Sequence, residues 1–160
     1  MTVTHTRMGH VYQLATGGYR GLKTVEDYLQ RSSVPSDLLE LIRIRVSQIN
    51  GCGLCVDLHS HRAQATGESH ERLWSLAAWR DTPFFTDQER AALALAEATT
   101  RIADNPDGVP DDVWTQAAEH FSEEQLAALV MAIASVNAWN RINVATRQTA
   151  GSFRNVGTLR

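Results

Sequence analysis

Apolar residues recur at intervals of three and four along most of this 160-residue chain, which is the spacing of one helix face. No stretch between turn residues alternates apolar and polar positions as a half-buried strand does. Seven segments carry the helical spacing: 10–30, 36–49, 52–65, 69–78, 86–103, 111–120 and 122–146. The sequence therefore predicts an all-α fold, a compact bundle of about seven helices.

Local signals mark where several of these helices start and stop. The segments at 86–89 and 122–125 are capping boxes, in which a hydroxyl and a carboxyl or amide side chain satisfy the free amides of a helix start. Asn50 and Gly51 tolerate the left-handed conformation that ends a helix. The segment 122–146 is apolar nearly all round, so we expect it to be central in the fold or in an oligomer. Three glycines are expected to weaken or kink the first segment: Gly17, Gly18 and Gly21.

The chain is long enough for one real core, since a chain of this size buries roughly 69% of its unfolded surface. No repeat or change in composition divides it. We expect a single helical domain over 10–148, an N-terminal extension over 1–9 and a C-terminal tail over 149–160, frayed from Gly151 onward.

Charge and hydropathy exclude two classes of partner. The net charge is −3, and the basic residues form no run, so a nucleic-acid partner is not expected. The longest apolar stretch, 129–136, is far shorter than a membrane span, and the first residues have no apolar signal core. We therefore expect a cytoplasmic protein without a membrane partner.

Cys52 and Cys55 are the two cysteines of the chain, and their spacing suggests metal binding or dithiol redox chemistry. A structural disulfide would close too small a loop to stabilise the fold much. Zinc would need further ligands, and His59 and His61 point about 200° apart on a helix. Val56 stands where a covalent haem motif needs histidine, and no strand precedes Cys52 as in thioredoxin-like folds. We expect no metal and no organic cofactor.

A redox dithiol on a helix remains. Cys52, Cys55 and His59 share one helical face, and that face begins at a helix N-terminus, where a thiolate is favoured. His59 could accept a thiol proton directly or through a water. Glu40, in the preceding helix, could face the same region and orient His59. Glu40 could instead be a solvated partner of Arg43 or Arg45.

The order and spacing of Glu40, Cys52, Cys55 and His59 resemble the core motif of the AhpD-like alkylhydroperoxidases of the carboxymuconolactone decarboxylase superfamily. The resemblance continues through 43–51, 85–93 and 138–145, and covers most of 10–146. It implies an AhpD-like helical bundle. It also implies Cys55 as the peroxidatic cysteine, Cys52 as the resolving cysteine, His59 as the proton acceptor and Glu40 as the far end of the relay.

The sequence departs from that motif between the cysteines. Some members carry a further histidine there, whereas this chain has Gly53 and Leu54, so one relay or positioning element is absent. The resemblance implies a hydroperoxide substrate and a dithiol reductant, either a lipoyl-bearing or a thioredoxin-like protein. It also implies a homo-oligomer, a hexamer or a trimer.

Two other functions stay open at this point. The first is a carboxymuconolactone-decarboxylase-like enzyme, although that branch generally lacks paired cysteines. The second is a redox-sensing oligomer without catalysis. On segment 122–146, three asparagines are spaced for hydrogen bonds between helices or subunits: Asn137, Asn140 and Asn143.

Overall fold

The computed structural model describes residues 5–153, and within that range the chain forms α-helices, two 3-10 helices and no strand. The elements are α1 (Val11–Leu14), α2 (Thr16–Arg31), α3 (Ser36–Asn50), α4 (Gly53–Ala65), α5 (His70–Ser75), η1 (Leu76–Asp81), α6 (Asp87–Thr100), η2 (Ile102–Asp104), α7 (Asp111–His120) and α8 (Glu123–Thr146). The predicted all-α fold is confirmed. Within the described range no helix is both long and apolar enough to cross a membrane.

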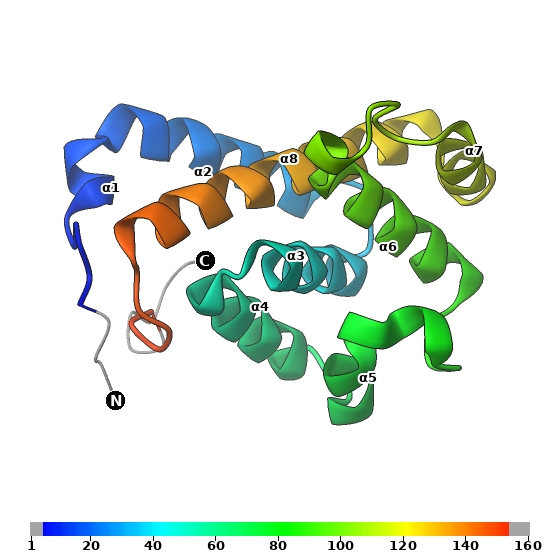
Figure 1. Cartoon of the computed structure of the whole chain (residues 1–160), viewed down its shortest axis with the longest axis horizontal. Helices are drawn as coiled ribbons and strands as arrows, with labels where there is room; N and C mark the ends of the chain where they lie inside the picture. The colour runs from blue at the N-terminus through cyan, green and yellow to red at the C-terminus, as the bar shows by residue number, and fades with distance from the viewer. Residues whose placement is uncertain (1–4, 154–160) are drawn as a thin grey trace.

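α3 and α8 form the centre of the bundle (Figure 1). α3 packs against α4, α6 and α8, and α8 also packs against α2, α6 and α7. α3 is buried over most of its length. The position expected for segment 122–146 is therefore confirmed, and α3 shares it.

Two apolar clusters lie on opposite sides of α3. The larger one joins α3 to α2, α6, α7 and α8 and includes Leu29, Ile42 and Leu129. The smaller one joins α3 to α4, η1 and α6 and includes Leu41 and Trp79. Because α3 contributes to both clusters, its orientation is fixed on two sides, and so are the side chains that it directs toward α4.

The break in the first predicted segment lies elsewhere than expected. The backbone leaves the helical conformation at Ala15, with φ −102° and ψ 40°, which separates α1 from α2. Gly17, Gly18 and Gly21 lie inside the continuous helix α2, so the predicted kink is wrong. All three are exposed, with open space around them, and no packing contact bends the helix there.

The helix-end signals behave as predicted. Thr86 with Glu89 and Ser122 with Gln125 form the two reciprocal capping boxes. Gly51 ends α3 in the left-handed conformation, with φ 68°. The next residue, Cys52, is already the N-cap of α4. This tight turn folds α4 back against α3.

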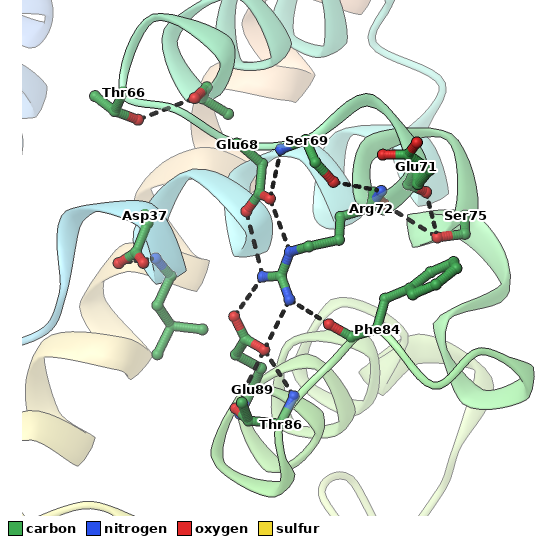
Figure 2. A network of polar contacts seen from close by, with 12 residues as sticks. Asp37, Thr66, Glu68, Ser69, Glu71, Arg72, Ser75, Phe84, Thr86 and Glu89 are labelled. Carbon is green, nitrogen blue, oxygen red and sulfur yellow. Dashed lines mark hydrogen bonds and ion pairs between the residues drawn. The ribbon is translucent and has the colours of Figure 1, made fainter.

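Arg72 joins α5 to α6 through the loop between them (Figure 2). Its guanidinium donates to Glu68 at 2.7 Å, to Glu89 at 2.5 Å and to the carbonyl oxygen of Phe84. Burial opposes the ionised form of Glu89, but the bonds from Arg72 and Thr86 and the charge of Arg72 together outweigh it, and the pKa of Glu89 lies below 4.5. Arg72 therefore links α5 to the start of α6 through ion pairs.

We predict that Arg72→Met lowers the free energy of unfolding by roughly 1–2 kcal/mol at neutral pH, because Glu68 and Glu89 lose their shared cation. The deficit shrinks as the pH falls from 4.5 through the lowered pKa of Glu89, because the protonated carboxyl no longer pairs with Arg72. Urea denaturation measures both effects. Arg20→Met, at an exposed position of α2, is the control and should change stability little. Equal losses in the two variants would contradict this role for Arg72.

Candidate active site

The turn between α3 and α4 places both cysteines at the start of α4. Cys52 and Cys55 form a disulfide with a Cα–Cα distance of 5.4 Å. The Sγ atom of Cys52 also accepts the backbone N–H of Cys55 at 3.4 Å, as an N-cap does. Both residues are almost fully buried, with exposed fractions of 1% and 3%. Both cysteines therefore belong to the packed interior, and their sulfur atoms lie close enough to form one disulfide.

His59 and Glu40 form a buried pair beside this turn. The Nδ1 atom of His59 lies 2.7 Å from Oε2 of Glu40. A carboxylate can only accept at this contact, so Nδ1 carries the proton and Nε2 of a neutral ring is left as an acceptor. The structure thus brings together the two residues that the sequence placed in separate helices. The alternative of a solvated Glu40 is wrong, since Glu40 is buried.

The electrostatics favour an ionised carboxylate beside a neutral imidazole. Burial raises the pKa of Glu40, but the bond to His59 and the charges of Arg43 and Arg62 outweigh it, and the pKa falls to about 2. Burial lowers the pKa of His59, more than Glu40 raises it. A neutral histidine held by a carboxylate can take up a proton.

A chain of buried polar contacts extends from Glu40 into the bundle. Arg43 donates to Glu40 at 2.7 Å and to Glu26 on α2 at 2.7 Å. Glu26 also accepts from the hydroxyl of Ser135 and from the indole N–H of Trp139 on α8. Glu26 had no signal in the sequence, because its contacts with Ser135 and Trp139 join distant parts of the chain. Arg45, the other predicted partner of Glu40, pairs with Glu97 instead.

Asn143 contacts the dithiol from α8. Its Nδ2 atom donates to Sγ of Cys55 at 3.3 Å, and its Oδ1 atom accepts from the Tyr12 hydroxyl at 2.5 Å. Burial raises the pKa of Tyr12 to about 12, although the bond to Asn143 opposes it, so the hydroxyl stays protonated. Tyr12 had no signal in the sequence. The spacing of the asparagines was a signal for Asn143.

The other two asparagines also bond between helices. Asn137 accepts from Asn50 at 2.9 Å and donates to Thr100. Asn140 accepts from Asn50 at 2.9 Å and donates to Ser47 at 3.0 Å. The predicted role of the three asparagines in joining helices is confirmed. Asn143 alone among them contacts a sulfur atom in the part of the chain that the structure describes.

A pocket of about 270 Å³ opens beside the N-terminus of α4. Cys52, Gly53 and Leu54 line one side, and Asn143 and Arg147 line another. Gly53 and Leu54 are the residues between the cysteines, where the sequence departs from the resembled motif. Cys52 is among the residues that line this pocket, whereas Cys55 is not.

His61 does not join the site. It is half exposed and lies 3.6 Å from Asp57, one helical turn away, while His59 faces Glu40. No cluster of histidine, cysteine or acidic side chains suited to a metal ion occurs among residues 5–153.

The first residues of the C-terminal tail lie against α4. The backbone N–H of Gly151 donates to Asp57 at 2.9 Å, and Phe153 packs on the cluster of Cys52, Leu54 and Cys55. The predicted fraying is therefore wrong for 151–153, because the tail covers apolar surface at the cysteines. Residues 154–160 of the predicted tail lie outside the described residues.

This chain is similar to one protein family and to two curated proteins. The model of the carboxymuconolactone decarboxylase family matches residues 18–98. The uncharacterized protein YdfG of Bacillus subtilis is 40% identical over 141 residues, 88% of this chain and 95% of its own length. The uncharacterized protein YnjA of Escherichia coli is 36% identical over 121 residues, which are 74% of this chain and 64% of YnjA.

A solved structure from Agrobacterium tumefaciens is similar over nearly the whole fold. It belongs to a protein of unknown function that is described as a candidate antioxidant defence protein, AhpD. It superimposes with a TM-score of 0.86 at 34% identity, and covers 91% of this chain and 98% of its own.

We predict that Glu40→Gln lowers the free energy of unfolding by about 3 kcal/mol at neutral pH, because Arg43 and His59 lose their buried ionised partner. A depressed carboxyl pKa stabilises the fold above its unfolded value. The deficit should therefore shrink as the pH falls from 4.5 toward 2. Urea titrations at several pH values measure it, with exposed Glu119→Gln as the control. A deficit that stays constant with pH would contradict an ionised Glu40.

Proposed function

Because the chain belongs to the carboxymuconolactone decarboxylase family, we propose that it is a thiol-dependent hydroperoxide reductase that cycles between a dithiol and a disulfide. The observation that carries the proposal is the geometry at the α3–α4 turn. There, two cysteines close enough to bond lie on the same helix as a buried histidine that a carboxylate orients. This arrangement supplies a nucleophile, a resolving thiol and a base.

The proposed reaction consumes one hydroperoxide for each disulfide formed. The thiolate of Cys55 attacks the O–O bond, an S–O bond forms, and the alkoxide leaves as alcohol after taking up a proton. The thiol of Cys52 then attacks the sulfenic sulfur, an S–S bond forms, and the hydroxyl leaves as water. The two cysteines supply the two electrons that reduce the peroxide.

The surroundings of each sulfur support this assignment of roles. Cys55 accepts a side-chain N–H from Asn143 and lies one helical turn before His59, so a proton acceptor and a donor to sulfur are both on its side. Cys52 is the cysteine among the residues that line the pocket, so we assign it as the one that an external thiol attacks. His59 would accept the thiol proton, and Glu40 would stabilise the charged ring.

Turnover requires a dithiol that reduces the disulfide. We propose a lipoyl-bearing or thioredoxin-like protein in the cytoplasm, and a trimer or hexamer as the working assembly. Exposed apolar side chains support contacts with a partner or a second copy of the chain, since Leu14 on α1 and Trp74 on α5 are more than three-quarters exposed. The similarity to the Agrobacterium protein supports an antioxidant role. No metal or organic cofactor is needed for these steps.

We predict that Cys52→Ser, Cys55→Ser and the double variant all lose steady-state consumption of an alkyl hydroperoxide with excess dithiol. A sulfenic acid should be trapped on Cys55 in Cys52→Ser after a single addition of peroxide. If a sulfenic acid is trapped only on Cys52, in the Cys55→Ser variant, the assigned roles are reversed. Full peroxide consumption by the double variant would overturn the proposal, because the reaction would then need neither cysteine.

We predict that His59→Asn slows peroxide reduction by roughly 100-fold, because the thiol proton loses its acceptor. Stopped-flow measurement of peroxide consumption at several pH values tests this, and the loss should be smaller at high pH, where the thiol ionises without help. His61→Asn is the matched control, since His61 lies on the same helix but is half exposed and away from Glu40. Equal rates in the two variants would remove His59 from the mechanism.

A further inference from the structure

The hydrogen bond from Asn143 to Cys55 distinguishes the two sulfurs. Cys52 accepts the backbone N–H of Cys55 at 3.4 Å, a bond within its own helical turn. Cys55 receives a side-chain N–H at 3.3 Å from a helix distant in sequence. An N–H that points at sulfur binds a thiolate more strongly than a thiol, because the bond is then charge-assisted. The donor from α8 therefore favours charge on Cys55.

Tyr12 fixes which end of the amide faces the sulfur. The Tyr12 hydroxyl donates to Oδ1 of Asn143, so Nδ2 is the atom left for Cys55. Tyr12 is itself held by Tyr19 at 5.3 Å and by Trp139 at 5.7 Å between ring centroids. The short helix α1 thus places a donor at the end of α8. A rotated amide would direct a carbonyl oxygen at the sulfur and would oppose its ionisation.

We propose that Asn143, oriented by Tyr12, is the positioning residue that makes Cys55, and not Cys52, the sulfur that carries the negative charge of the dithiol. The inference deepens the proposed function and rests on it for its part in turnover. Asn143 acts through the sulfur that it bonds and takes no part in proton transfer.

The same preference directs the reduction of the disulfide. When a thiolate of the external dithiol attacks, one sulfur joins it in a mixed disulfide and the other leaves with the electron pair. The sulfur that better carries charge leaves faster, which is Cys55. Attack therefore falls on Cys52, which is one of the residues that line the pocket. The second thiol of the reductant then displaces Cys52 and becomes oxidised to a disulfide.

Substitutions that test this proposal leave the other charged groups near the dithiol unchanged. α3 contributes Glu40 and Arg43, α4 contributes His59 and Arg62, and Arg147 lines the pocket after α8. Substitutions at Asn143 and Tyr12 remove none of them. A change in the ionisation of Cys55 can then be assigned to the hydrogen bond.

The test measures the ionisation of Cys55 without peroxide. In Cys52→Ser, the thiolate absorbance is titrated with pH, with and without Asn143→Leu. We expect the midpoint to rise by about one pH unit, the effect of losing one hydrogen bond to a charged group. Tyr12→Phe keeps the ring contacts and should raise the midpoint by less. Asn140→Leu, the same substitution one turn earlier, loses buried bonds to Ser47 and Asn50 and should leave the midpoint unchanged.

A second measurement uses the chain with both cysteines. After full reduction, limiting iodoacetamide should label Cys55 before Cys52, and Asn143→Leu should lower that preference roughly 10-fold. Thermal melting followed by circular dichroism checks that each variant is folded. If Asn143→Leu does not fold, the shift in Tyr12→Phe decides the question.

Unchanged midpoints in both Asn143→Leu and Tyr12→Phe would overturn the inference, and so would earlier labelling of Cys52 in the unmodified chain. A shifted midpoint in a chain that consumes no peroxide has a different meaning. That result would overturn the proposed function and would still support Asn143 as the residue that selects the charged sulfur.

Discussion

The buried carboxylate of Glu40 is the charge on which the site depends. It accepts hydrogen bonds from His59 and Arg43, and Arg43 joins it to Glu26 on another helix. Burying an ion is costly unless it is paired and hydrogen-bonded, so these contacts must form together. The same contacts give the histidine one tautomer and one orientation. Stability of the bundle and readiness of the base thus come from one arrangement.

The α3–α4 turn links this charge to the sulfur chemistry. α3 is fixed by apolar packing on two sides, and Gly51 reverses the chain so that Cys52 begins α4. The dithiol and the histidine then lie within one short helix, while Glu40 comes from the helix before it. α8 and α1 complete the surroundings from the other side through Asn143 and Tyr12. The dithiol, Glu40 and Asn143 are therefore positioned by three different helices of the core, α4, α3 and α8.

The sequence was sufficient for the parts of the site that depend on local spacing. Helical periodicity, the capping boxes and the spacing of Cys52, Cys55 and His59 are properties of neighbouring residues, and the fold and family that they indicated are confirmed. Glu26 and Tyr12 act through contacts across more than a hundred residues, for which one sequence holds no signal. The packing of Phe153 on the cysteines likewise depends on a surface that exists only after folding.

The most direct test of the proposed reaction is the intact mass of the reduced protein after one equivalent of an alkyl hydroperoxide, followed with time beside the alcohol produced. The proposal predicts rapid loss of two hydrogens, with one alcohol formed for each disulfide. A protein that stays reduced for hours, while a generic thiol control reacts with the same peroxide, would contradict it.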